Sequence, residues 1–152
     1  MSDVSSKRRT LEEVYRSSRT ALTRLAFLLV GDRDDADDIV QSVFATAASR
    51  WTTINDPTSY LRRAVVNRAH DAHRRSFRRA VPDARIADVG EPELDIVWRL
   101  VDSLPNPQRA VVVLRFYEDL SLVNIAALLG RPASTVRSDL HRALIDLKGS
   151  LP

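Results

Sequence analysis

The sequence of 152 residues has no cysteine, so neither disulfide bonds nor thiolate metal sites can form. Glycine occurs only 4 times and aromatic residues make up 6% of the chain, which argues against a many-stranded sheet and favours an all-helical fold. The longest apolar run, residues 25–30, is far too short to cross a bilayer. Residues 1–9 are polar and lack the apolar segment of a secretory signal. We therefore expect a cytoplasmic protein without membrane insertion.

Charge is distributed unevenly along the chain, although the net charge is only +3. Residues 32–38 include five aspartates and one arginine, whereas residues 62–79 include seven arginines and two histidines but a single acid, Asp71. Segregated charge of this kind indicates separate interaction surfaces. The basic stretch predicts a surface that binds a polyanion such as nucleic acid, and the structural alternative is a solvated charged helix face.

Apolar residues recur at helical spacing over about residues 10–30, 32–51 and 57–75, which predicts three helices. Gly31 is a natural C-cap for the first helix, and the aspartates that follow it supply N-cap and first-turn carboxylates for the second. Pro57 is well placed in the first turn of the third helix. The three helices would form one small domain.

Helical periodicity fails over residues 80–93, where two prolines and a glycine interrupt a polar stretch. Such a composition is typical of a flexible linker. The chain is therefore predicted to be all-α, with a first domain at residues 10–79 and a second at residues 94–150. The second would contain four helices, the first of which is expected to bury Ile96, Val97, Leu100, Val101 and Leu104.

The last two helices of the second domain have the spacing of a helix-turn-helix. The small Ala126 lets the second helix approach closely, and Gly130 can adopt the left-handed conformation of the tight turn. Val136 and Leu140 would pack the recognition helix against its support, although such a pattern also arises by chance in helical pairs. The helical wheel places the candidate major-groove residues on or beside the outer face: Ser134, Arg137, Ser138, His141 and Arg142.

The third helix of the first domain has a polar, basic outward face opposite its apolar side. This face carries Arg63, Asn67, His70 and Arg74, so cationic groups that can meet phosphates surround an amide that can hydrogen-bond a base edge. Tyr60 lies close to the same face and is a candidate for stacking on an unpaired base. These residues predict a surface for nucleic acid.

The loop before this helix, residues 51–56, is rich in flat and amide side chains. Such side chains suit the capture of an unpaired base. Trp51 in this loop is equally well explained as a residue of the hydrophobic core.

Four consecutive segments resemble the signatures of extracytoplasmic-function (ECF) sigma factors, which direct bacterial RNA polymerase to promoters. The resemblance spans about residues 10–148, and the order and spacing of the segments make it more specific than any one of them. The segments are LAFLLVGD at 25–32, DADDIVQSVF at 35–44, DPTSYLRRAVVNR at 56–68 and LPNPQRAVVVLRFYEDLS at 104–121.

The resemblance implies that the first domain corresponds to sigma region 2, the second to region 4, and that the protein needs no cofactor and performs no catalytic step. The implied partners are core RNA polymerase and promoter DNA, both as duplex and as melted strand. Control by an anti-sigma protein is common among such relatives. Asn67 falls at the base-reading asparagine of the family, and the final helix at the reader of the upstream duplex element. The implied polymerase-binding residues are Asp35, Asp38, Gln41, Val43 and Phe44.

The sequence departs from the family pattern at four positions. Asp139 stands in the recognition helix where relatives usually carry a basic residue, and a carboxylate near phosphates would weaken DNA contact or indicate an unusual promoter element. Arg131 occupies a turn site that is often apolar. The other two departures, Ser42 and Asn124, each replace a common acid.

Two other interpretations stay open at this level. A stand-alone transcriptional regulator would use the helix-turn-helix on an operator, which leaves the second basic surface without a role. An enzyme would need a reactive cluster, and the one suggestive set is His70, Asp71 and His73. That set lacks further metal-ligand spacing and lies among arginines that would repel a cation.

Overall fold

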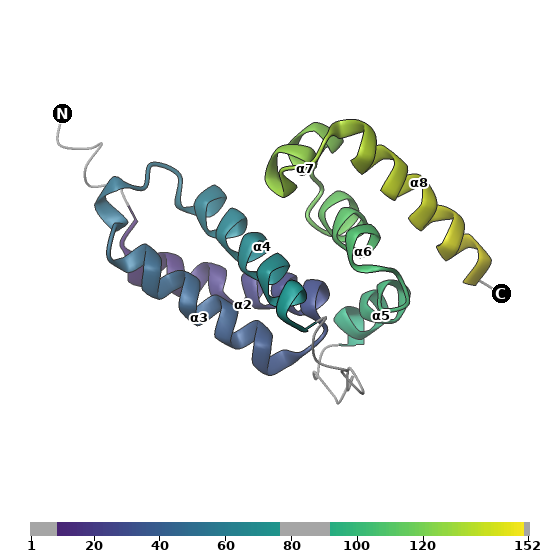
Figure 1. The fold of residues 1–152 in the computed structure, drawn as a ribbon. Coiled ribbons are helices and arrows are strands. Elements are labelled where there is room, and N and C mark those ends of the chain that lie inside the picture. Colours follow the sequence, from purple (N-terminus) through teal and green to yellow (C-terminus); the bar gives the residue numbers. More distant parts are fainter. Residues whose placement is uncertain (1–8, 77–91, 151–152) are drawn as a thin grey trace.

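The computed structural model describes residues 9–76 and 92–150 of the chain. Within these ranges it contains seven α-helices, one 3-10 turn, one π-helical turn and no strand, which confirms the all-α prediction. The helices form two groups that lie side by side, as Figure 1 shows. None of the helices in these ranges combines the length and the apolar composition that a membrane span requires.

The first group is a three-helix domain. It consists of α2 (Leu11–Val30), α3 (Arg33–Ala48) and α4 (Pro57–Ser76), with a 3-10 turn, η1 (Trp51–Thr53), within the predicted loop. The three helices pack on one another in every pairwise combination. The sequence prediction of three helices is therefore confirmed.

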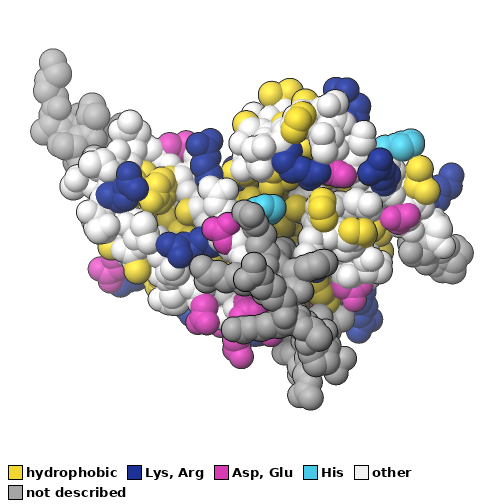
Figure 2. All heavy atoms as spheres, viewed as in Figure 1, with side chains coloured by type: hydrophobic (Ala, Val, Ile, Leu, Met, Phe, Trp, Pro, Cys, Tyr) yellow, Lys and Arg dark blue, Asp and Glu magenta, His cyan; other side chains and the backbone are white. Residues whose placement is uncertain are grey.

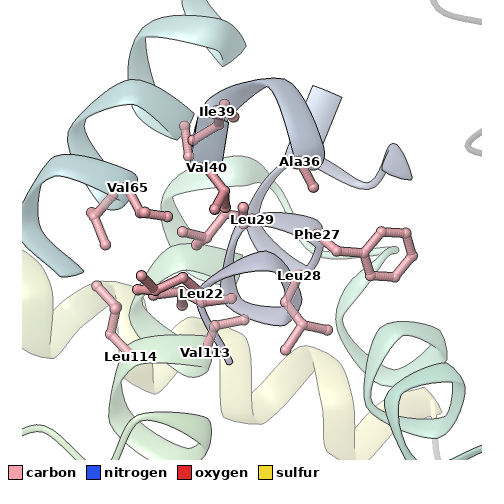
Figure 3. Packing of buried hydrophobic residues seen from close by; sticks show 14 of the residues in the cluster. Leu22, Phe27, Leu28, Leu29, Ala36, Ile39, Val40, Val65, Val113 and Leu114 are labelled. Carbon is pink, nitrogen blue, oxygen red and sulfur yellow. The ribbon is translucent and has the colours of Figure 1, made fainter. Parts of the chain in front are cut away.

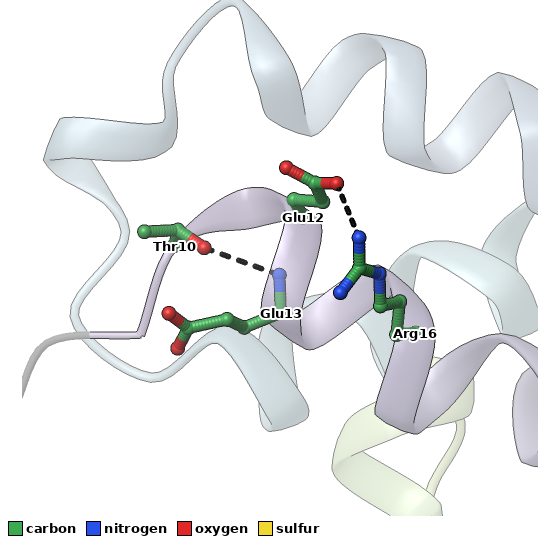
Figure 4. Close-up of polar contacts among 4 residues, drawn as sticks. All are labelled: Thr10, Glu12, Glu13 and Arg16. Carbon is green, nitrogen blue, oxygen red and sulfur yellow. Dashed lines mark hydrogen bonds and ion pairs between the residues drawn. The ribbon is translucent and has the colours of Figure 1, made fainter.

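Local chemistry explains where the helices of this domain begin and end. The hydroxyl of Thr10 accepts the backbone N–H of Glu13 at 3.1 Å and caps α2, as Figure 4 shows. Gly31 ends the same helix in the left-handed conformation, at φ 78°. Asp32 then accepts the backbone N–H of Asp35 at 2.9 Å and starts α3.

The second group contains four helices, as predicted: α5 (Pro92–Val101), α6 (Asn106–Val112), α7 (Leu122–Leu129) and α8 (Ala133–Ser150). The chain leaves α6 through a π-helical turn, η2 (Val113–Tyr117), which widens the end of the helix. The hydroxyl of Ser121 accepts the backbone N–H of Asn124 at 3.1 Å and caps α7.

The packing of α5 confirms part of the predicted stripe, since Val101 and Leu104 are buried and Val97 packs against the core. Ile96 and Leu100 are exposed, by 59% and 44%, whereas Trp98 is only 1% exposed. Trp98 packs against the first domain, since its ring centroid lies 5.3 Å from that of Phe27 in α2. Periodicity within α5 could not reveal this, because the surface that buries Trp98 belongs to the other domain.

Gly31 leaves the space that Trp98 occupies. A Cβ built at this glycine would lie 2.5 Å from an indole ring carbon, and the positive φ would strain any side chain as well. Arg109 of α6 lies 5.2 Å from the Trp98 ring centroid. Burial lowers the pKa of the Arg109 guanidinium, and attraction to Asp102 opposes this effect.

The two domains share one hydrophobic core. Val113 and Leu114 of η2 are buried together with Leu22 and Leu28 of α2, and Figure 3 shows these side chains converging. Figure 2 shows further hydrophobic side chains in the hollow between the two domains. The sequence predicted two helical domains but did not predict that they dock.

An ion pair and helix contacts add to this docking. Nε of Arg62 in α4 lies 3.1 Å from Oε2 of Glu118, which follows η2, and both side chains are partly exposed. Helix α4 also packs against α7. Of the predicted linker, residues 80–91 lie outside the described ranges, and residues 92 and 93 already belong to α5.

Candidate nucleic-acid interface

Helix α4 separates an apolar from a polar side, as predicted. Leu61 and Val65 are fully buried, whereas Arg63, Asn67 and His70 are exposed on the other side. Their spacing of three or four residues brings these three side chains to one face of the helix. Arg74 lies in α4, but its side chain is outside the part of the chain that the structure describes.

Tyr60 lies at the start of α4, half-buried, where its ring packs against the core. Asp56 fixes this first turn by accepting the hydroxyl of Ser59 at 2.8 Å and the backbone N–H of Ser59 at 3.3 Å. These two hydrogen bonds, the hydroxyl first, hold the pKa of Asp56 below its usual range. The cap therefore positions the turn that carries Tyr60.

The segment before α4 is more structural than the sequence suggested. The indole N–H of Trp51 donates to the backbone carbonyl of Arg9 at 3.3 Å, and the half-buried ring packs against the core. Ile54 is buried. Asn55 is the exposed amide of this segment, so the packing favours the core interpretation of Trp51.

The basic stretch does not form one uniform surface. Arg62 turns to the domain boundary and its partner Glu118. Arg68 donates to the hydroxyl of Thr46 in α3 at 3.1 Å. The number of arginines in the sequence therefore overestimates the positive charge that is open to a partner, because Arg62 and Arg68 make contacts within the protein.

The helix-turn-helix has the geometry that its spacing predicted. Gly130 ends α7 in the left-handed conformation, at φ 64°, and Ile125 and Val136 are fully buried between the helices. The hydroxyl of Ser138 donates within the helix to the carbonyl of Ser134 at 3.0 Å. Helix α8 exposes all of its predicted major-groove residues: Ser134, Arg137, Ser138, His141 and Arg142.

The expectation that Asp139 lies near DNA phosphates is wrong. Its side chain is 8% exposed, and its Oδ2 lies 2.5 Å from Nη2 of Arg131 in the turn. Asp139 shares the buried side of α8 with Val136 and Ala143. The carboxylate therefore faces the protein, and its charge is balanced there.

Helix α3 exposes three of the five predicted polymerase-binding residues, Asp35, Asp38 and Gln41. The amide of Gln41 donates to the hydroxyl of Tyr15 at 3.0 Å. Val43 and Phe44 are buried, and Phe44 packs edge-on against Tyr15 with 4.9 Å between the ring centroids. We correct the prediction for these two residues, because core packing removes them from the surface that a partner could touch.

The cluster that suggested an enzyme is only partly described. His70 and Asp71 are exposed on α4, and the side chain of His73 lies outside the described part. Among the described side chains, no group of three histidines or acids could hold a metal ion. A cavity of about 720 Å³ lies at the domain boundary, and its lining includes His70, Val66 and Leu129.

Comparisons with known proteins match both halves of the chain. The family model described as Sigma-70 region 2 matches residues 14–79, and Sigma-70, region 4 matches residues 94–147. The chain is 38% identical over 150 residues to the RNA polymerase sigma-E factor of Streptomyces antibioticus, across 92% of this chain and 83% of that protein. It is 30% identical over 169 residues to the ECF RNA polymerase sigma factor SigD of Mycobacterium tuberculosis (strain ATCC 25618 / H37Rv), across 97% of this chain and 80% of that protein.

A solved structure has the same fold. It is the complex of the sigma factor RpoE with the anti-sigma factor NepR from Bartonella quintana, with a TM-score of 0.73, 21% identity, and coverage of 91% of this chain and 94% of that chain. Two family models in the right order and relatives matched over most of their length agree with the two helical domains. The chain belongs to the ECF type of RNA polymerase sigma factors, the subunits that bind core polymerase and direct it to promoters.

Proposed function

We propose that this sigma factor reads promoter DNA in two states with two separate helix faces. The face of α4 would hold the melted strand, and the face of α8 would read the upstream duplex. The observation that carries the proposal is that each helix exposes cationic and amide or hydroxyl groups directly opposite its own buried stripe. Each face is thus held rigidly by packing behind it.

The chemistry of α8 suits duplex DNA. An α-helix fits the major groove, and guanidinium groups such as those of Arg137 and Arg142 can bond guanine edges or phosphates. His141 and Ser138 supply shorter polar groups between them. The exposed side of α8 therefore has both contacts that position a helix and contacts that select a base.

The chemistry of α4 suits an unpaired strand. Arg63 and His70 lie one turn on either side of Asn67, so a backbone could follow the cations while a base meets the amide. Tyr60 offers a ring for stacking at the start of the helix. Each stacked base contributes about 1–3 kcal/mol, so binding of the unpaired state would drive opening without hydrolysis. In this proposal the protein performs no catalytic step and acts in the cytoplasm.

The acidic face of α3 is proposed to dock on core polymerase. Asp35 and Asp38 are exposed in the first half of this helix, so they present negative charge to a basic partner. Gln41, held by Tyr15, would complete the contact. An anti-sigma protein is a further partner that we propose, as in the NepR complex of the structurally similar RpoE.

Reconstitution with sigma-free polymerase tests the proposal. The purified chain would be mixed with core polymerase from Streptomyces, separated by gel filtration, and used for run-off transcription on a library of genomic fragments. We expect co-elution and starts that require the added chain, with Arg16→Met, an exposed change on α2, behaving like the wild type. Operator-like DNA binding without polymerase association would instead indicate a stand-alone regulator.

A further inference from the structure

An ion pair joins the turn of the helix-turn-helix to the middle of the recognition helix. Nη2 of Arg131 lies 2.5 Å from Oδ2 of Asp139, and the two side chains are 27% and 8% exposed. The groups are not aligned as a hydrogen bond, so the contact is mainly electrostatic. Both residues depart from the family pattern, and each supplies the charge that the other requires.

The position of Asp139 makes a partner necessary. The residue shares the buried side of α8 with Val136 and Ala143, which are both fully buried. The carboxylate therefore has little access to water, since only 8% of the side chain is exposed. A buried ionised group is strongly destabilising without a counter-charge. Among the described contacts, the guanidinium of Arg131 is the counter-charge of Asp139.

The position of Arg131 makes the pair a restraint on the helix. Arg131 directly follows Gly130, whose left-handed conformation forms the turn, and its backbone N–H donates to the carbonyl of Ala126 at 3.1 Å. The backbone of Arg131 is thus fixed to α7, while its side chain holds α8. Apolar contacts permit small rotations of a helix, but a short ion pair restricts them.

Rotation of α8 decides which side chains reach a base. Ser138 directly precedes Asp139, and Arg142 lies one turn after it on the exposed side. A small rotation about the helix axis would displace both groups from a base edge, and base-specific hydrogen bonds tolerate little displacement. Contacts with phosphates through the long arginine side chains would be less sensitive.

We propose that Arg131 and Asp139 are positioning residues, which fix the rotation of the recognition helix and so contribute to promoter selectivity without touching DNA. The inference rests on the proposed function, because it takes α8 as the reader of the upstream duplex. It assigns the two departures from the family pattern one shared structural purpose.

A double-mutant cycle tests this assignment with Arg131→Met, Asp139→Leu and the double variant. The probe is the upstream duplex recovered by selection from a random library with the wild-type protein bound to core polymerase. Selectivity is the ratio of dissociation constants for a scrambled and the selected duplex, measured for each holoenzyme well below its Tm. A second cycle measures Tm of the same proteins without DNA.

We expect Arg131→Met to reduce selectivity about tenfold, because it leaves the buried carboxylate unpaired and frees the helix to rotate. The double variant should recover most of the loss. Binding to the scrambled duplex and association with core polymerase should stay within about twofold of the wild type. Arg16→Met, which breaks the exposed Glu12–Arg16 pair in α2, is the matched control. It should change neither the selectivity ratio nor Tm appreciably.

Three results would separate the possible failures. If the effects of the two substitutions on Tm are non-additive but the selectivity of each variant is unchanged, the positioning role is overturned and the pair only stabilises the protein. Tighter binding of Asp139→Asn to selected and scrambled duplex alike would place the carboxylate beside phosphates and overturn the assignment. If the wild type itself does not distinguish the two duplexes, the proposed function of α8 fails as well.

Discussion

Helices α4 and α8 each present a polar face over a buried stripe, but their surroundings differ. Helix α8 packs mainly on α6 and α7. The side of α8 that carries Arg137 and Arg142 is exposed to solvent. Helix α4 lies between the rest of its own domain and α7. Its Arg62 belongs to the domain boundary and Arg63, the next residue, to the exposed face. On α4, two arginines that are adjacent in sequence therefore differ: Arg62 pairs with the second domain, whereas Arg63 lies on the exposed face.

The basic residues of α4 therefore have two different roles, because some of them contact the second domain and others are exposed. Where one side of a helix faces solvent along its whole length, every basic residue on that side can bind a ligand. Beside a second domain, part of the basic stretch is used to hold that domain, as the pair between Arg62 and Glu118 shows. The docking of the second domain beside Arg62 therefore limits the part of the basic α4 face that stays open to a partner.

The largest effect should come from removing the docking residue itself. Trp98→Ala should lower the free energy of unfolding by about 3–5 kcal/mol, because it empties a buried aromatic site between the domains. It should also raise hydrogen exchange at Val66, on the flank of α4 that borders the boundary cavity. Ile96→Ala, on the exposed side of the same helix, is the control and should shift the unfolding free energy by less than about 0.5 kcal/mol. Equal effects of the two changes would contradict the docking seen here.

The two DNA faces should fail in different ways. Asn67→Ala should impair promoter opening and selectivity at the melted element, and Arg142→Ala should weaken upstream duplex binding, each by about 1–3 kcal/mol. Both variants should associate normally with core polymerase. Transcription from premelted and intact templates, with gel filtration alongside, measures the three properties. A loss of polymerase association in step with opening would argue against the placement of Asn67.

Adjacent arginines on α4 should respond differently to salt. Arg63→Gln should reduce the slope of log affinity against log salt for single-stranded DNA by about one, since one phosphate contact is lost. Arg62→Gln should leave that slope unchanged and lower the free energy of unfolding by less than about 1 kcal/mol, because its partner is Glu118. Titrations at several salt concentrations and denaturant unfolding distinguish the two. Identical salt slopes in both variants would show that the domain boundary does not divide the basic face.

The smallest effect concerns the cap that starts α4. Hydrogen bonds from Ser59 lower the pKa of Asp56 below its usual value of 3.8. A carboxyl with a lowered folded-state pKa stabilises the protein above the usual value and loses that contribution as pH falls through the folded-state pKa. Asp56→Asn should therefore lower Tm near neutral pH, and the difference from the wild type should vanish well below pH 3.8. A difference that persists at acid pH would mean that ionisation of Asp56 does not stabilise the cap.

Local chemistry made much of the fold predictable. Gly31 and Gly130 mark helix ends because both adopt the left-handed conformation. The spacing of Ala126, Gly130 and Val136 located the helix-turn-helix. The helical wheel placed Arg142 and Asn67 outward, where the structure has them. These features depend on residues within a few turns of one another, so a sequence pattern contains them.

What could not be predicted depends on contacts between distant segments. Trp98 is buried by a surface more than 60 residues earlier in the chain, at Phe27 and Gly31. Phe44 was assigned to the polymerase-binding surface by the family resemblance alone, and the structure instead buries it against Tyr15, a residue of another helix. Asp139 and Arg131 each depart from the family pattern, and the sequence alone explains neither departure. The structure shows that the two residues form an ion pair with each other.

Photo-crosslinking from single positions in the assembled holoenzyme tests the central claim most directly. A photoreactive amino acid would replace Arg63 on α4 or Arg137 on α8, with the protein bound to core polymerase and a mapped promoter. The account predicts that position 63 labels bases that become reactive to a single-strand probe on opening, and that position 137 labels only the paired upstream region. Labelling of the same segment from both positions, or labelling from neither, would contradict it.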